Sequence, residues 1–381
     1  MVKTVGKTSG GRRPGLISAV RKPVDSRTRG RRTGRDLLIV TVLGILFIVI
    51  FAAVFLRHPQ DRGIRLWMLN HGPDQLVVIN PDTGESDKEL LIADGLQQFI
   101  FNHRKDTAYV ANVVDVSNRV TLVDTRSYLK TDQVIVEGVP QGLAMFPDDR
   151  YLAVIVGNKT DFMAGGFDVL DLQEASTADP SRKRVAYHER NLSLTSFIAV
   201  DDKGENIFCL DAKASELFIF SMSQKKLVRT IDIGAAPMGL LYPEQGDKFF
   251  VSSIANESIT VFNKAEDAKD INIVGRVTYK RFRHMALSPD AKTLYAPVWE
   301  TKEVAVIDVP SLKVAKTYKT PTSPGLAAMS PDGSEIYVVS LDSGEVYVID
   351  SASGTIKRTI PTKGEFRDIK VIQDSEKPAT G

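Results

Sequence analysis

The chain has 381 residues, of which 43% are hydrophobic and 25% charged, and its 49 basic and 47 acidic side chains nearly balance. This length leaves room for one large all-β domain with additional segments. The single cysteine, Cys209, excludes a disulfide within the chain and a metal site built from several cysteines. Because it lies in the apolar run 207–210, we expect Cys209 to be a small buried hydrophobic residue.

Residues 1–36 form a basic tail with eleven Lys or Arg and only two acidic residues, whereas the rest of the chain carries an acidic excess. This asymmetry is typical of a localisation signal and argues against nucleic-acid binding. The tail contains too little apolar surface to fold alone. We expect it to contact a partner subunit or anionic lipid, where each basic residue contributes about 1 kcal/mol. The arginines expected to make this contact are Arg12, Arg13, Arg31 and Arg32.

Residues 37–56 are twenty consecutive uncharged residues, enough for a helix that spans the hydrocarbon core of a bilayer, about 30 Å. Basic residues crowd its N-terminal side, which places the N-terminus in the cytoplasm. A cleaved signal peptide is the alternative, but the basic region is too long and the apolar run exceeds the usual length of roughly 7–15 residues. We therefore predict an uncleaved anchor in the inner membrane, a short linker at 57–63 and a periplasmic body.

From residue 64 onward, short β-branched and aromatic runs alternate with turns rich in Gly, Asp and Ser. A segment that resembles an inner strand followed by a turn occurs seven times, at intervals of roughly 40 to 55 residues, which suits a four-stranded propeller blade. The copies begin at Gln97, Gln141, Thr195, Pro237, Arg283, Pro324 and Phe366.

The last copy has no blade after it, and residues 65–92 have no inner strand before them. These two halves complete one blade, and this closure leaves no unpaired edge at the seam. We therefore predict an all-β fold with one N-terminal transmembrane α-helix. Its main domain is a seven-bladed β-propeller at 64–373, in which the C-terminal strand closes the first blade, and a tail follows at 374–381.

Several runs resemble the YVTN family of bacterial β-propellers. They are SPDG followed by IYVVS, SPDA followed by LYAPV, and AYVAN at 108–112. The resemblance covers residues 65–373 and implies a fold similar to 6-phosphogluconolactonase, the methylamine dehydrogenase heavy chain and the haem d1 domain of nitrite reductase. The WD dipeptide signature, the Trp-docking motif of quinoprotein dehydrogenases and the Cys-x-x-Cys-His motif for covalent haem are absent from the sequence. The resemblance therefore implies the architecture and leaves the activity open.

The mouth of the central channel is the expected position of a ligand site in such a fold. The repeat alignment places Gln97, Gln141, Arg283 and Arg367 there, with His284 beside them. Arg283, His284 and Arg367 can form an anion site, and the alternative is a solvated channel without a ligand. The alignment brings together no carboxylate pair, His cluster or metal-ligand set, so we predict no catalytic residue, metal or cofactor.

The third blade is predicted to carry two long loops, at 157–166 and 173–184. Long loops on a regular scaffold are common sites of function. The first loop is unusually apolar, and we predict contact with a partner or lipid headgroups through Phe162, Met163 and Phe167. The alternative is a loop that folds onto its own blade.

Three functions remain open from the sequence. The first is a non-enzymatic scaffold or accessory subunit of a larger membrane complex, with a respiratory or photosynthetic complex as a candidate host, because no catalytic constellation is visible and the tether is short. The second is a lactonase-like or cofactor-bearing propeller enzyme, which the family resemblance implies. The third is a periplasmic sensor of a small ligand, although no cytoplasmic signalling domain accompanies it.

Overall fold

A computed structural model describes residues 61–92, 95–112, 118–158, 165–175, 183–211, 213–282 and 284–374. All of these residues belong to one of the two units into which the chain divides, Pro59–Gly381. Within the described ranges, no helix is long and apolar enough to cross a membrane. The basic tail at 1–36 and the predicted helix at 37–56 lie outside those ranges.

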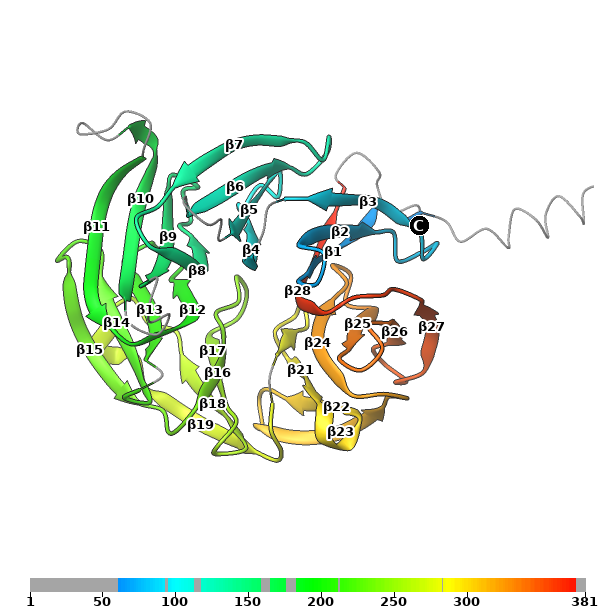
Figure 1. The fold of residues 1–381 in the computed structure, drawn as a ribbon. Coiled ribbons are helices and arrows are strands. Elements are labelled where there is room, and N and C mark those ends of the chain that lie inside the picture. The colour runs from blue at the N-terminus through cyan, green and yellow to red at the C-terminus, as the bar shows by residue number, and fades with distance from the viewer. Residues whose placement is uncertain are drawn as a thin grey trace, which may run out of the picture. The chain divides into compact units, whose positions relative to one another are not determined.

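The described strands form seven four-stranded antiparallel sheets around a common centre (Figure 1). This arrangement confirms the predicted all-β, seven-bladed propeller. The first blade, from the centre outward, contains β28 (Phe366–Gln373), β1 (Ile64–Asn70), β2 (Gln75–Ile79) and β3 (Ser86–Leu91). The second contains β4 (Leu96–Phe101), β5 (Thr107–Asn112), β6 (Arg119–Asp124) and β7 (Lys130–Ile135). The third contains β8 (Val139–Met145), β9 (Tyr151–Gly157), β10 (Gly165–Ala175) and β11 (Lys183–Leu192).

The remaining blades follow the same order. The fourth contains β12 (Leu194–Val200), β13 (Asn206–Asp211), β14 (Glu216–Ser221) and β15 (Lys226–Asp232), and the fifth β16 (Pro237–Leu241), β17 (Lys248–Ser253), β18 (Ser258–Asn263) and β19 (Ile273–Thr278). The sixth contains β20 (Ala286–Leu287), β21 (Thr293–Val298), β22 (Glu303–Asp308) and β23 (Lys313–Lys319), and the seventh β24 (Pro324–Met329), β25 (Glu335–Ser340), β26 (Val346–Asp350) and β27 (Ile356–Ile360). Two 3₁₀ turns, η1 (Ala268–Asp270) and η2 (Trp299–Thr301), complete the described elements.

The turn between β24 and β25 shows why the repeat folds as it does. Gly333 adopts φ 73°, which glycine reaches without strain, and its N–H donates to the Ser330 carbonyl at 2.9 Å. The Ser330 hydroxyl donates to Asp332 at 2.6 Å, and Asp332 in turn accepts from the Ser334 N–H at 3.0 Å. These bonds within the turn start β25 in register with its neighbours.

The ring closes through β28, which pairs antiparallel with β1 from Ile64↔Gln373 to Asn70↔Phe366. The two ends of the described chain thus share one sheet, as the sequence predicts. Seven apolar clusters of described residues then fill the spaces between neighbouring blades, and each cluster draws side chains from two blades. Cys209 belongs to one of these clusters, and its complete burial raises the pKa of its thiol.

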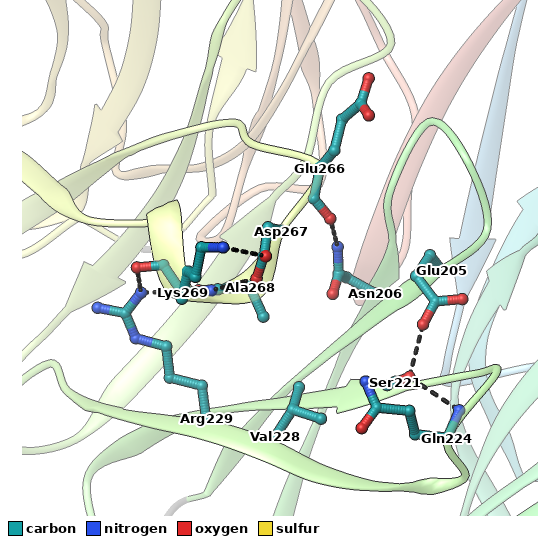
Figure 2. A pocket seen from close by; sticks show the side chains of 10 residues that line it. All are labelled: Glu205, Asn206, Ser221, Gln224, Val228, Arg229, Glu266, Asp267, Ala268 and Lys269. Atoms are coloured by element: carbon teal, nitrogen blue, oxygen red, sulfur yellow. Dashed lines mark hydrogen bonds and ion pairs between the residues drawn. The ribbon is translucent and has the colours of Figure 1, made fainter.

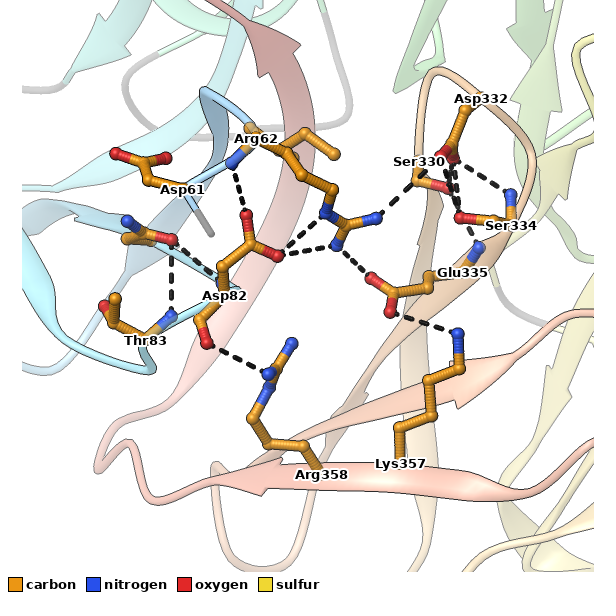
Figure 3. A network of polar contacts seen from close by, with 12 residues as sticks. Asp61, Arg62, Asp82, Thr83, Ser330, Asp332, Ser334, Glu335, Lys357 and Arg358 are labelled. Carbon is orange, nitrogen blue, oxygen red and sulfur yellow. Dashed lines mark hydrogen bonds and ion pairs between the residues drawn. The ribbon is translucent and has the colours of Figure 1, made fainter. Parts of the chain in front are cut away.

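Arg62 connects the first and last blades directly before β1 (Figure 3). Its backbone N–H and Nε each donate to the Asp82 carboxylate at 2.8 Å, and Nη2 donates to Glu335 at 2.5 Å. Asp82 and Glu335 are 4% and 5% exposed, so each needs a cation beside it. Lys357 and Arg358 complete the network, through the Glu335 carboxylate and the Asp82 carbonyl respectively.

Replacing Arg62 with alanine is expected to destabilise the propeller by about 2 kcal/mol, because two buried carboxylates lose their shared cation. Urea unfolding of the full chain measures this change. Arg104→Ala is the matched control, because the Arg104 side chain is 74% exposed and its ion pairs lie at the surface; we expect a change below about 0.5 kcal/mol. Equal losses in the two variants would contradict a bridging role for Arg62.

Candidate functional site

The inner strands surround two hollows of the central channel. The first channel cavity has a volume of about 470 Å³ and lies toward the starts of the inner strands. The second channel cavity, of about 580 Å³, lies toward their ends. The two cavities share four lining residues, which are Gln98, Leu240, Leu241 and Lys370. These residues therefore form the boundary between the two halves of the channel.

The structure brings together three of the predicted channel residues. Gln97, His284 and Arg367 all line the first channel cavity. Gln141 does not line either cavity; it is buried within β8. Arg283 lies outside the described residues. The predicted mouth site is thus partly assembled, from β28 of the first blade, β4 of the second and the segment before β20 of the sixth.

Two charged residues of the same cavity were not singled out from the sequence: Asp368 and Lys370, both on β28. They lie two residues apart, so they point to the same side of the strand. The alignment predicts their neighbour Arg367, which lines the same cavity. The pairing of β1 with β28 contains a register shift between Leu69 and Asn70, and a bulge of this kind changes which side chains face the centre. The sequence feature that indicates Asp368 and Lys370 as channel residues is the alternation of charged and apolar residues at 368–371 of β28.

Asp368 lies between His284 and Lys370 and contacts both of them in the first channel cavity. It is 6% exposed and lies 3.8 Å from His284 Nε2 and 3.4 Å from Lys370 Nζ. Burial acts to raise the pKa of Asp368, but the Lys370 ammonium and His284 outweigh burial and hold the pKa below its usual value. Lys370 Nζ also lies 5.6 Å from the centre of the Phe99 ring, a cation–π distance.

Two buried polar atoms at this position make no hydrogen bond to the described residues. They are His284 Nδ1 and Asp368 Oδ2, and the contact of Asp368 Oδ2 is its 3.4 Å ion pair with Lys370. Most buried polar atoms in native proteins are satisfied, so such atoms beside a cavity indicate a position for water or a ligand. The cluster can therefore bind a polar group that enters the first channel cavity.

The rim of the second channel cavity carries charges that are paired between blades. His103 Nδ1 lies 2.8 Å from Asp149, and Lys105 Nζ lies 3.0 Å from Glu244. Lys264 Nζ lies 3.0 Å from Asp202 and donates to the Pro243 carbonyl at 2.5 Å. The His103–Asp149 and Lys264–Asp202 pairs join neighbouring blades, whereas the Lys105–Glu244 pair links the second blade to the fifth. The first role of these ion pairs is structural.

A third hollow of about 500 Å³ lies beside η1, between the fourth and fifth blades (Figure 2). Arg229 donates there to the carbonyls of Ala268 and Lys269 at 2.7 and 2.6 Å. Asn206 donates to the Glu266 carbonyl at 3.0 Å. The Arg229 guanidinium and the Asn206 amide are thus used to hold the two blades together, which makes this hollow a structural contact.

The predicted partner contact at Phe167 is wrong. Phe167 lies within β10 and is fully buried, with its ring edge-on to Tyr187 at 5.4 Å and to Phe220 at 5.0 Å. The strand begins at Gly165, before the end of the loop expected at 157–166. Successive side chains of a strand point to opposite faces, and that of Phe167 points into the core. Phe162 and Met163 lie outside the described residues, as do Arg12, Arg13, Arg31 and Arg32.

Among the described residues, no group of three or more His, Cys, Asp or Glu side chains is placed to hold a metal ion. The family model of YncE-like β-propellers matches residues 58–372. The chain belongs to the YncE-like β-propeller family. A resemblance to bacterial YVTN-type propellers was expected from the sequence, and this membership confirms it.

Curated relatives of this YncE-like chain include the YncE protein of Salmonella typhimurium, which is 26% identical over 155 residues. The aligned region covers 39% of this chain and 42% of that relative, less than half of its length. YncE of Salmonella typhi matches to the same extent.

Solved structures share the fold at low identity. The periplasmic gluconolactonase PpgL of Pseudomonas aeruginosa has a TM-score of 0.63 at 16% identity, covering 81% of this chain and 99% of that one. A putative 6-phosphogluconolactonase of Bacteroides fragilis has a TM-score of 0.63 at 15% identity, covering 82% and 99%. Hydrazine synthase of Kuenenia stuttgartiensis has a TM-score of 0.60 at 15% identity, covering 78% and 97%. Identities this low support the fold alone.

Asp368→Asn is expected to lower the free energy of unfolding by about 1–2 kcal/mol at pH 7, because the Lys370 ammonium loses a buried counter-charge. The pKa of Asp368 is lowered in the folded state, so its charge stabilises the fold above the unfolded pKa of about 4 and this contribution is lost as the pH falls. Urea unfolding at pH 7 and at pH 3 measures the change, and the difference between wild type and variant should shrink at pH 3.

The control for Asp368→Asn is Glu89→Gln on β3, where the side chain is exposed. This variant should match wild type at pH 7. A deficit in Asp368→Asn that stays constant between pH 7 and pH 3 would show that the charge of Asp368 is not what stabilises the channel.

Proposed function

We propose that this YncE-like propeller is a non-enzymatic scaffold or accessory subunit of a larger membrane complex. In this proposal the residues at 37–56 anchor the chain in the inner membrane, and the propeller lies on the periplasmic side. The basic tail at 1–36 contacts anionic lipid or a partner subunit in the cytoplasm. A cofactor is not part of the proposed role.

The observation that carries the proposal is the outer hairpin of the third blade. β10 and β11 contain 11 and 10 residues, whereas the two outer strands of every other blade contain five to seven. β9 pairs with β10 only as far as Asp171. The residues after Asp171 therefore extend the hairpin beyond its own blade, where they are available to another protein.

Ion pairs hold the base of this hairpin. Asp171 is fully buried and accepts from Arg150 Nη2 at 2.7 Å and from Arg184 Nη2 at 3.0 Å. Hydrogen bonds from Arg150 and Arg184 lower the pKa of Asp171 to about 2, so it stays ionised at physiological pH. Glu174 also pairs with both arginines, at 3.0 and 2.7 Å. A base of this kind supports a rigid projecting arm.

The position of Arg62 supports a short tether. Five residues, 57–61, separate the predicted membrane helix from Arg62, which is fixed to the propeller through Asp82 and Glu335. Even fully extended, five residues span at most about 18 Å. The proposed anchor would therefore keep the propeller close to the membrane, where a complex subunit is expected to act.

A binding role is favoured over the lactonase-like alternative by the geometry of the channel. A catalytic His–carboxylate pair normally lies within about 2.6–3.2 Å. His284 Nε2 and Asp368 Oδ1 are 3.8 Å apart, and Lys370 shares the same carboxylate. This arrangement is better suited to electrostatic binding than to proton transfer.

Mild-detergent extraction followed by native mass spectrometry tests the proposed function. We expect the chain to co-purify with other membrane proteins at a fixed stoichiometry. Replacing residues 173–182 with Asn-Gly removes the end of the hairpin and Glu174 but retains Asp171 with Arg150 and Arg184. This variant should release the partner while the propeller stays folded, with only a small loss of thermal stability. Recovery of the wild-type chain as a lone monomer would count against the scaffold role.

A chain without residues 1–36 serves as the second variant in this experiment. It separates the contribution of the basic tail from that of the hairpin, because the two segments are proposed to act on different sides of the membrane. Partner loss in the tail deletion but not in the hairpin variant would move the proposed contact from the propeller to the cytoplasmic tail.

A further inference from the structure

The lining of the first channel cavity is partly polar and partly apolar. Its polar and charged residues include Gln97 and Gln98 from β4 and Asp368 and Lys370 from β28. Its apolar wall includes Met238 from β16, Leu326 from β24 and Leu341 from the turn after β25. At about 470 Å³ the cavity lies within the usual range for small-molecule pockets, about 300–1,000 Å³. Such walls favour a ligand with a polar end and an apolar body.

The net charge of the residues that line the cavity determines which sign of charge is favoured at the polar end of the ligand. The ionisable residues in its described lining are His284, Arg367, Asp368 and Lys370. With a neutral imidazole, the two permanent cations exceed the single carboxylate, and protonation of the imidazole increases the excess. An anionic group is therefore favoured over a cationic one.

Lys370 is placed to receive the anion. Asp368 Oδ2 and the Phe99 ring hold its ammonium at the boundary between the two channel cavities. An ammonium has three donors, and one carboxylate contact leaves donors for a ligand. The side chain is 31% exposed, so solvent and ligand can reach it. Asp368 acts as the positioning residue for this cation.

The apolar wall also offers exposed surface for contact with the body of a ligand. Leu341 is 40% exposed and leans over the inner strand at Gly325, where a side-chain Cβ would come within 2.2 Å of a Leu341 methyl group. Only glycine leaves room for Leu341 to adopt this position. An apolar side chain exposed at the edge of a cavity gains free energy when a ligand covers it.

We infer that the first channel cavity binds a small organic anion, whose negative group pairs with Lys370 and whose apolar body rests on Met238, Leu326 and Leu341. This site is separate from the outer hairpin of the third blade. It therefore adds a ligand to the proposed scaffold role and does not depend on it.

Isothermal titration calorimetry of the detergent-solubilised full chain with 3-phenylpropanoate tests the inference, with a titration into detergent alone as the blank. Three probes separate the parts of the ligand. 3-Phenylpropan-1-ol has the body without the charge, 3-phenylpropylammonium reverses the charge, and acetate has the charge without the body. We expect 3-phenylpropanoate to bind at least about tenfold more tightly than each of the three.

Variants then assign the site. Lys370→Gln should weaken 3-phenylpropanoate binding about tenfold and Lys370→Arg should retain it, while Lys226→Gln on the exposed start of β15 should match wild type. Met238→Glu places a negative charge on the apolar wall and should also abolish tight binding, with Leu227→Glu as its surface control. This second pair keeps the test decisive should Lys370→Gln fail to fold.

Several results would overturn the inference. They are the absence of 3-phenylpropanoate binding to the wild-type chain, equal affinity for the alcohol or the ammonium, and wild-type affinity in a folded Lys370→Gln or Met238→Glu variant.

Discussion

Phe366–Gln373 and Ile64–Asn70, from opposite ends of the described chain, pair as neighbouring strands of one sheet. Each of the seven apolar clusters between blades needs both of its blades in place, so the ring loses two of them if this sheet opens. Arg62 strengthens the same junction, because its guanidinium pairs with carboxylates of the first and last blades. Strand pairing, two apolar clusters and one shared arginine therefore all contribute to closure of the ring.

The closing strand also builds the candidate site. β28 is the innermost strand of its blade, and it carries both the buried carboxylate and the lysine of the first channel cavity. A ligand that binds Lys370 would therefore stabilise the strand on which closure depends. Ring closure and the charged lining of the first channel cavity are thus linked through one strand, β28.

Much of the fold could be predicted from the sequence because blade repeats are local. The turn at 330–333 and the Tyr- and Val-rich strand after it recur in recognisable form, and their number implied closure by β28. The site was harder to predict, because a register shift beside Asn70 decides which β28 residues face the channel. Gln141 and Phe167 were predicted as contact residues, but both are buried within strands, β8 and β10. Strand boundaries and side-chain direction follow from packing between blades, which repeat alignment does not contain.

Hydrogen–deuterium exchange of the full chain tests the central claim, that β28 closes the ring as a stable strand of the first blade. The account predicts that amides of β28 and β1 exchange as slowly as those of the other inner strands, for example β8 and β24. Rapid exchange of β28, together with slow exchange of β8 and β24, would contradict it, because the ring would then be open at the seam in solution.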